Sequence, residues 1–357
     1  MKGLFVTSSD LLSKKQGDHI YSSQVFRAIN RNMEIELTKL NQKNNYFVCF
    51  LFFLFPMMWV RNFNFSVFKY LIINRNKYEL VFIDHFRCAW VIFLIKIFTK
   101  SKVIVINHNL ESKVYLSFFH SKECSLAKRI FSFYQYLVVL VWEKIVFKLT
   151  DSVIVISEDD VDTSFVSKYL ILPPYAENIY SHKENDGIPT VIIIGSYHWR
   201  IKQFNIEMFL SSLAKKEQCR FNVIIAGNGP DEFFAKIKSN YHFVQVIQNF
   251  SCLGDLNGLA TIGVCPDNAG GGFKLKTLDY YRLNLPMVAI EHGASGILEP
   301  VIPTLYSFSD LADEIYELLS DADKLKGIQK EQSIYFSKYH TESYFSDAVN
   351  RFINTIL

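Results

Sequence analysis

The stretch from Pro266 to Ile297 constrains the fold of this chain more than any other segment. It follows an apolar run at residues 262–265, contains three successive glycines, and includes a second apolar run at residues 287–290. Short apolar runs separated by a glycine loop and a helical segment are typical of buried parallel strands. We therefore expect the order strand, glycine loop, helix, strand, which belongs to an α/β fold.

The glycine loop has the chemistry of an anion-binding site. Glycines leave backbone N–H groups accessible, and the N-terminus of a helix adds partial positive charge. Lys274 and Lys276 supply full charges for a diphosphate, and Asp279, one turn later, can accept a hydrogen bond from a ribose or sugar hydroxyl. A plain glycine loop on an unrelated α/β protein is the alternative interpretation.

The same stretch resembles the donor-binding segment of GT-B glycosyltransferases of the family 4 (group 1) type. Many members carry a Glu, seven residues and a second Glu, where this chain has Gly271 and Asp279. A branch of the family reads glycine, apolar, Lys, any residue, Lys, two residues, Glu, and residues 272–279 are similar to that form with Asp279 at its end. The chain departs from the usual pattern at the first Glu.

Two further segments of the second half are similar to the same family. Gly195 and Ser196 end an apolar run, Trp199 and Asn205 follow, and residues 227–230 match the family's glycine-x-glycine-proline turn. The resemblance implies that a nucleotide sugar is bound by Gly195, Ser196, Arg200, Gly271, Gly272, Phe273, Lys274, Lys276 and Asp279. It also implies that Lys276 is catalytic, because lysines and a helix N-terminus stabilise the leaving phosphate without a metal.

Polar clusters follow two apolar strands in the first half of the chain, one after residue 83 and one after residue 106. The carboxyl ends of parallel strands form the ligand edge of a sheet. The run His108-Asn109-x-Glu111 resembles the family loop that faces the acceptor and the donor sugar. The resemblance implies that His108 lies at the reaction centre, and that Asn109 and Glu111, with Gly17 and His19 of the first loop, line the acceptor side. A histidine that only caps a strand end is the alternative.

The length of 357 residues is sufficient for two domains with separate cores. Prolines at 173 and 174 and a polar stretch at 180–189 indicate a boundary between an N-terminal Rossmann-like acceptor-binding domain (1–184) and a C-terminal Rossmann-like nucleotide-sugar-binding domain (185–357). The resemblance implies the GT-B architecture, α/β with the two domains facing across a cleft. It also implies a last helix at about 344–357 that crosses back to the first domain.

Cysteines and acidic residues argue against a metal site. The six cysteines are scattered without a CxxC pair, which indicates reduced thiols in a cytosolic setting. The start of the chain has too short an apolar run for a signal peptide. Asp160-Val161-Asp162 reads DxD, but acidic residues at a helix start explain this run better than a metal does. We expect no metal and no cofactor, with the nucleotide diphosphate sugar bound as a substrate.

A phenylalanine-rich stretch and the charge distribution raise the question of a membrane surface. Residues 46–60 are strongly apolar, but too short to span a bilayer comfortably and interrupted by Pro56. Arg61, Lys69, Arg75 and Lys77 follow among aromatic residues. Residues 1–180 carry 22 basic and 15 acidic side chains, against 16 and 20 in residues 181–357. The pattern fits either a core segment followed by a surface helix, or a patch that lies on an anionic leaflet.

The resemblance implies a hexosyltransferase-type glycosyltransferase that moves a sugar from a nucleotide diphosphate donor to a lipid-linked or saccharide acceptor in surface polysaccharide synthesis. It implies retention of the anomeric configuration and independence from metal. We expect a cytoplasmic protein, peripherally associated with the inner face of the cytoplasmic membrane, and no nucleic-acid partner. An epimerase or hydrolase on the same fold, and a non-catalytic protein that binds a glycan or a partner, are the alternatives.

Overall fold

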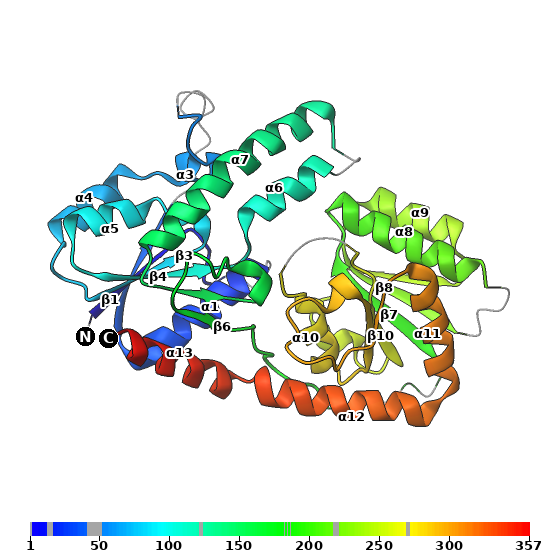
Figure 1. Cartoon of the computed structure of the whole chain (residues 1–357). Helices are drawn as coiled ribbons and strands as arrows, with labels where there is room; N and C mark the ends of the chain where they lie inside the picture. Colours follow the sequence, from blue (N-terminus) through cyan, green and yellow to red (C-terminus); the bar gives the residue numbers. More distant parts are fainter. Residues whose placement is uncertain are drawn as a thin grey trace. The chain divides into compact units, whose positions relative to one another are not determined.

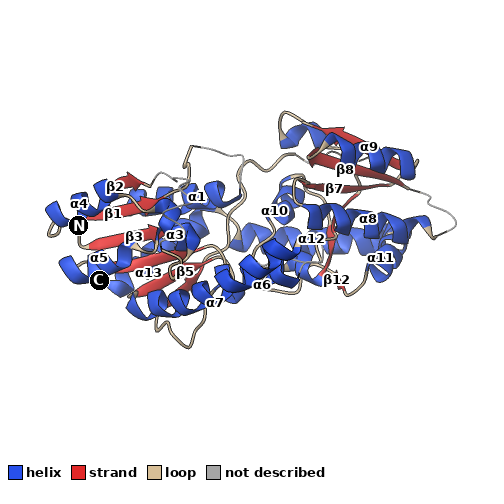
Figure 2. Cartoon of the chain, turned by 90° about the horizontal axis from the view of Figure 1, so that it is seen from above, coloured by secondary structure: helices blue, strands red, loops and turns tan. Residues whose placement is uncertain are grey.

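The chain forms two compact units, which a computed structural model describes at residues 2–12, 17–40, 52–120, 124–181, 183, 185, 187–216, 221–268 and 272–357. The first unit comprises Met1–Pro174 and Ser343–Leu357, and the second Tyr175–Glu342. Each unit contains a six-stranded sheet with helices packed on both faces (Figures 1 and 2). The predicted α/β class with two Rossmann-like domains is confirmed.

The first sheet is entirely parallel, with the strand order β2-β1-β3-β4-β5-β6. Its strands are β1 (Lys2–Thr7), β2 (Glu34–Lys39), β3 (Leu80–Asp84), β4 (Lys102–Asn107), β5 (Ser152–Val155) and β6 (Tyr169–Ile171). The chain runs from β1 outward to β2 and then returns to the other side of β1 as β3. The carboxyl ends of β1 and β3 therefore lie at a topological switch point, where open α/β sheets bind ligands.

The helices of the first unit cover both faces of this sheet. They are α1 (Gly17–Asn32), α3 (Met57–Asn62), α4 (Phe65–Ile73), α5 (Val91–Phe98), α6 (Glu111–His120), α7 (Leu126–Leu149) and α13 (Glu342–Ile356). Alternate residues of the central strands, such as Val81 and Ile83, pack against α4, α5 and α7 in one core cluster. Within the apolar segment 118–148, residues 118–120 end α6 and residues 126–148 belong to α7.

The second sheet is also parallel, with the order β12-β11-β10-β7-β8-β9. Its strands are β7 (Thr190–Ser196), β8 (Asn222–Asn228), β9 (Val244–Gln248), β10 (Ile262–Cys265), β11 (Met287–Ile290) and β12 (Thr304–Leu305). The helices are α8 (Arg200–Ala214), α9 (Asp231–Asn240), α10 (Leu275–Arg282), α11 (Phe308–Ser320) and α12 (Ala322–Tyr339). The switch point of this sheet lies between β7 and β10, so α10, which follows β10, begins beside it.

The C-terminal helix α13 belongs to the first unit. Phe345 packs edge-on against the Tyr21 ring of α1, and Lys168 Nζ donates to the Thr355 carbonyl at 3.0 Å. The chain changes unit between Pro174 and Tyr175, whereas its composition suggested 184/185. The reason is that residues after 174 bond to the second unit, as in the 3.0 Å contact from Ala176 N to the His340 carbonyl.

The described part of the phenylalanine-rich stretch is exposed at its start and packs into the core at its end. Residues 46–51 lie outside the described part, while Phe52, Phe53, Leu54 and Phe55 form an exposed turn, and Trp59 of α3 is buried. Among the described helices, α7 alone is long and apolar enough to cross a membrane by length and composition, and 33% of its most apolar window is buried.

Candidate active site

The lysine pair that the sequence singled out lies at the start of α10. Lys276, in the first turn, places its Nζ 3.0 Å and 2.9 Å from the two carboxylate oxygens of Asp267. Asp267 follows β10 and is buried, and Lys276 is only 9% exposed. Burial disfavours the charge of Lys276, but the Asp267 carboxylate outweighs it and raises the lysine pKa above its usual range. The pKa of Asp267 is lowered: burial opposes this, and the positive charge of Lys276 prevails.

Two more lysines act on the same carboxylate. Lys202, in the first turn of α8, and Lys274, at the N-cap of α10, both contribute positive charge that lowers the pKa of Asp267. Burial lowers the pKa values of both lysines. For Lys202, repulsion from Lys276 is the second cause of the lowered pKa. Three lysines around one carboxylate leave a surplus of positive charge, which suits a doubly charged diphosphate.

A buried tyrosine fixes α10 over the sheet. The Tyr280 hydroxyl donates to the Val264 carbonyl at 2.6 Å and accepts from Ile194 N at 3.1 Å. Gly263 makes this fit possible, because a Cβ there would meet the Tyr280 ring at 2.5 Å. The helix turn that carries Lys276 is therefore held against β7 and β10, at the switch point.

The structure places the next predicted donor residues at the end of β7, at the start of α8 and before α10. Gly195 and Ser196 end β7 beside β8, where a Cβ on Gly227 (φ +146°) would lie 1.8 Å from the Gly195 carbonyl oxygen. Arg200 is the exposed first residue of α8. Gly272 is buried with a φ of +72°, which favours glycine, and Gly271 lies outside the described residues.

Phe273 and Asp279 are the last two of this set. The Phe273 ring lies 5.3 Å from the ring of His340. Asp279 pairs with Arg282 Nη1 at 3.2 Å on the same helix. Burial raises the pKa of Asp279 to about 6, although the Arg282 charge acts in the opposite direction. A role for Asp279 at a ribose stays a prediction.

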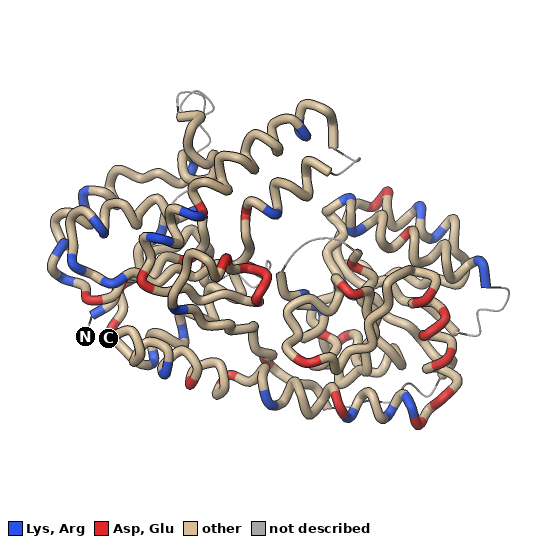
Figure 3. Tube along the Cα trace, viewed as in Figure 1, with Lys and Arg blue, Asp and Glu red and all other residues tan. Residues whose placement is uncertain are grey.

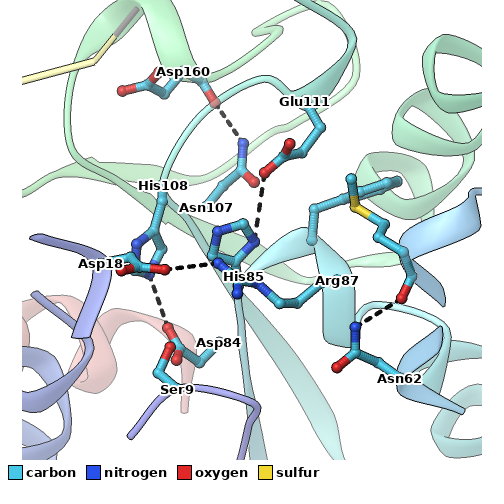
Figure 4. Close-up of polar contacts among 12 residues, drawn as sticks. Ser9, Asp18, Asn62, Asp84, His85, Arg87, Asn107, His108, Glu111 and Asp160 are labelled. Atoms are coloured by element: carbon cyan, nitrogen blue, oxygen red, sulfur yellow. Dashed lines mark hydrogen bonds and ion pairs between the residues drawn. The ribbon is translucent and has the colours of Figure 1, made fainter. Parts of the chain in front are cut away.

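The first unit carries a buried polar cluster at the carboxyl ends of β1, β3 and β4 (Figure 4). His108, directly after β4, places Nε2 2.9 Å from Asp84 Oδ1, and both side chains are buried. The other oxygen of Asp84 accepts from Thr7 Oγ1 at 2.5 Å. The Tyr21 ring packs edge-on against the imidazole of His108, at 5.1 Å between centroids. The carboxylate thus fixes the orientation of His108.

His85 connects this pair to Glu111. Its φ of +73° lies in a region that non-glycine residues rarely adopt, and such strain is concentrated at functional sites. Its imidazole lies 4.8 Å from that of His108, and its Nδ1 is 3.6 Å from Glu111 Oε1. Burial lowers the pKa of His85 well below its ordinary value and raises that of Glu111 to about 7. The cluster therefore holds a neutral histidine beside a carboxyl group able to exchange a proton near neutral pH.

An arginine and a second carboxylate complete the cluster. Arg87 Nη2 donates to Asp18 Oδ2 at 2.8 Å. Burial would raise the pKa of Asp18, but the Arg87 guanidinium lowers it. The same arginine charge also opposes the rise in the pKa of Glu111. Arg87 therefore favours the ionised form of both carboxyl groups, and it bonds directly to Asp18.

The structure brings only some of the predicted acceptor-side residues into this cluster. His108 and Glu111 are members, and Asn109 is half-buried between them in sequence. Gly17 begins α1, and His19 Nδ1 is buried without a hydrogen-bond partner among the described residues. Sequence reasoning assigned no role to Asp18, Asp84, His85 and Arg87, nor to Lys202 and Asp267 of the second unit. The one feature of the sequence that pointed to the first-unit cluster was the polar pair Asp84-His85, which directly follows an apolar run.

The DxD run has a structural explanation. Asp160 Oδ2 accepts from Ser157 N at 3.2 Å as part of a capping box, and it also accepts from Ser157 Oγ at 2.7 Å. Asn107 also donates to the carbonyl of Asp160, at 2.9 Å. Among the described residues, no group of three or more His, Cys, Asp or Glu side chains is arranged to hold a metal ion.

Comparisons with known proteins agree with this geometry. Residues 188–321, which contain β7, α8, β10 and α10, match the family model described as "Glycosyl transferases group 1". No curated protein sequence matches the chain. Sucrose-phosphate synthase from Thermosynechococcus elongatus has a similar structure, with a TM-score of 0.72 at 15% identity, covering 100% of this chain and 99% of that one.

Two other solved structures are similar over the whole length. The lipopolysaccharide outer core galactosyltransferase WaaB gives a TM-score of 0.67 at 12% identity, with 100% of both chains covered. Anabaena HepE, in complex with UDP, gives 0.64 at 13% identity, covering 99% of this chain and 100% of that one. At these identities the structural similarity establishes the fold.

The fold and the family match together define an enzyme of the GT-B glycosyltransferase class. Within that class, residues 188–321 match the group 1 type, and the resemblance read from residues 272–279 is confirmed.

Proposed function

We propose that this enzyme transfers a hexose from a nucleotide diphosphate sugar to a lipid-linked or saccharide acceptor in surface polysaccharide synthesis. The single observation that supports the donor class most strongly is the set of three lysines around Asp267 at the start of α10. HepE, which shares the fold, is described in complex with UDP and with UDP-glucose. A diphosphate leaving group is the chemistry that such a positive site favours.

The roles of the lysines follow from their partners. Asp267 keeps Lys276 protonated and oriented, so that its charge is in place before the bond to the sugar breaks. Lys274 and Lys202 lie at helix N-termini, where backbone N–H groups add to the positive potential. We propose that these groups stabilise the leaving diphosphate without a metal ion, and that the reaction retains the anomeric configuration.

In the first unit, His108 is proposed to contact the reacting sugar or the acceptor hydroxyl. Its Nε2 is engaged by Asp84, so the remaining ring nitrogen, Nδ1, is the group left for a substrate contact. Glu111, with a pKa of about 7, is the carboxyl group best suited to take the proton from an acceptor hydroxyl.

We also propose that the enzyme works in the cytoplasm at the inner face of an anionic membrane. The basic first half of the sequence and the exposed turn at Phe52–Phe55 support this proposal. A lipid-linked acceptor would then be met at the surface where it is embedded.

The test of the function is an assay of donor cleavage. The protein is incubated with a panel of UDP-, GDP-, ADP- and dTDP-sugars, with and without a polyprenyl-diphosphate-linked acceptor, and nucleoside diphosphate release is measured. We expect one donor to give release that depends on the acceptor and survives EDTA. Release without acceptor would indicate a hydrolase, and conversion of the donor sugar without release an epimerase. Loss of activity in EDTA, restored by Mn²⁺, would contradict metal independence.

A further inference from the structure

Helix α7 exposes apolar side chains and buries polar ones, which is the reverse of an ordinary surface helix. Leu126, Ile130, Phe133, Leu137 and Val141 recur at intervals of three or four residues, so they share one face of the helix. All five are exposed, with exposed fractions between 41% and 69%. A surface helix normally presents polar residues to water and apolar ones to the core. An apolar stripe of this length therefore indicates a surface that is covered when the protein works.

The opposite, buried face of α7 carries polar side chains. Ser132, Gln135 and Glu143 are buried there beside Val139 and Val146. Gln135 Oε1 accepts from Met57 N at 2.9 Å, and Glu143 Oε1 accepts from Ser112 N at 3.3 Å. These bonds attach α7 to α3 and to α6 of the same unit. The exposed stripe is thus fixed outward, because rotating the helix would break both bonds.

The exposed phenylalanine turn is attached to the same helix. Trp142 Nε1 donates to the Leu54 carbonyl at 2.9 Å, and the Phe55 ring stacks on Trp142 at 5.0 Å between centroids. The Tyr134 hydroxyl donates to the Phe53 carbonyl. Residues 52–55 are between 40% and 63% exposed. We call these four residues and the five of the stripe the α7 surface.

The charged residues within the segments that carry the α7 surface are basic. Residues 52–65 and 124–142 contain Arg61, Lys128 and Arg129 and no acidic side chain. In Figure 3, the upper part of α7 is tan apart from a blue segment. An apolar surface that carries basic residues complements an anionic bilayer, where apolar side chains enter the acyl boundary and basic ones meet headgroups.

We infer that the α7 surface is the membrane-docking surface of this enzyme, with α7 lying along an anionic leaflet. The inference rests on the proposed membrane location and adds the residues that enter the lipid. Although α7 is long enough to span a bilayer, its bonds through Gln135 and Glu143 keep one face on protein. The helix therefore lies on the membrane rather than across it.

The test replaces apolar residues of the stripe with glutamine and measures how the protein binds to vesicles of phosphatidylglycerol and phosphatidylcholine. The triple variant Ile130→Gln, Leu137→Gln, Val141→Gln removes three exposed apolar side chains and no internal bond. We expect its sedimentation with vesicles to fall about tenfold or more. The matched control is Phe204→Gln with Ile334→Gln, which are 48% and 59% exposed in the second unit. Affinity for UDP, measured by calorimetry, should stay unchanged in both variants, which shows that they fold.

A second readout locates the turn directly. The variant Phe53→Trp should gain fluorescence quenching by brominated lipids relative to the parent. Sedimentation of the triple variant equal to that of the parent would overturn the inference while leaving the membrane location standing. If the parent itself does not bind vesicles, both proposals fail. A dimer that forms without lipid in the parent and not in the triple variant would also overturn the inference, by assigning the stripe to a second copy.

Discussion

Lys276 is the residue on which the donor site depends most directly. Its ammonium group is buried and held by both oxygens of Asp267, so its charge is fixed before substrate arrives. The sequence did not predict the role of Asp267, because proximity in sequence does not fix the distance in space between an acidic side chain and a lysine. The two side chains meet only because β10 and α10 are adjacent at the switch point of the sheet.

The first prediction concerns the Lys276→Ala variant. The variant loses one charge-assisted contact to the diphosphate, worth about 1.5–3 kcal/mol, so its affinity for UDP should fall by a factor of tens or more. Calorimetric titration measures this. Lys236→Ala is the matched control, because Lys236 also pairs with a carboxylate in the second unit but is exposed. UDP binding by the Lys276 variant with parental affinity would show that this turn is not the phosphate site.

The second prediction concerns Glu111 and pH. Its pKa is about 7 in the folded protein and near 4.5 in the unfolded chain, so the folded state holds the proton more tightly. The contribution of Glu111 to stability is therefore complete below about pH 4.5 and is lost as the pH rises through about 7. Glu111→Gln should remove this loss, at most about 3 kcal/mol.

Urea denaturation at about pH 5 and about pH 7.5 measures the difference. Glu143→Gln is the companion variant, because burial also raises the pKa of Glu143 to about 7, although this side chain bonds to Ser112 N and lies near Glu111 without contacting the histidines. Both variants should flatten the pH dependence of stability, and the pH profile of sugar transfer should shift most in Glu111→Gln. A parental pH profile in the Glu111 variant would remove Glu111 from the proposed chemistry.

At the scale of elements, α10 is positioned by a single side chain. Tyr280 bonds to the backbones of β7 and β10, and its ring occupies the space that Gly263 leaves open. The sequence predicted the helix and both strands, because their apolar and glycine patterns are local. The clamp was not predictable, since it joins residues 86 positions apart in the chain.

The third prediction follows from this clamp. Tyr280→Phe leaves the Ile194 N–H and the Val264 carbonyl without their buried partner, which should cost about 1–3 kcal/mol of stability. Because the lysine turn loses its support, UDP affinity should fall as well. Tyr197→Phe, which removes a similar buried bond to the Ile193 carbonyl, should lower stability without that loss of affinity. Equal effects of the two variants on UDP binding would show that the clamp does not position the site.

At the scale of the whole molecule, the charge distribution bears on where the enzyme works. Arg61, Lys69 and Arg75 follow the phenylalanine turn in sequence, and Lys69 and Arg75 are exposed. Lys77, the fourth basic residue of that run, pairs with Glu36 at 2.6 Å. Its charge is therefore already balanced within the protein, which the sequence did not indicate.

The fourth prediction concerns binding to vesicles. A basic residue near an anionic surface contributes on the order of 1 kcal/mol, and salt screens this attraction. The protein should sediment with anionic vesicles at low ionic strength, and much of it should be released at about 0.5 M NaCl. Arg61, Lys69 and Arg75 changed together to Gln should weaken binding strongly, whereas Lys77→Gln alone should have little effect. Equal binding to neutral and anionic vesicles would contradict the electrostatic part of the proposal.

The sequence by itself determined the α/β class, the strand and helix order around the donor loop, and the likeness to group 1 glycosyltransferases. Those features rest on apolar runs, glycines and lysines within a few residues of one another, where local geometry is decisive. Only the tertiary structure decided that Asp84 orients His108, that Asp267 holds Lys276, and that α7 turns its apolar side outward. Parallel strands bring together side chains from distant crossovers, and hydrophobic periodicity shows which residues share a helix face without showing which face is covered.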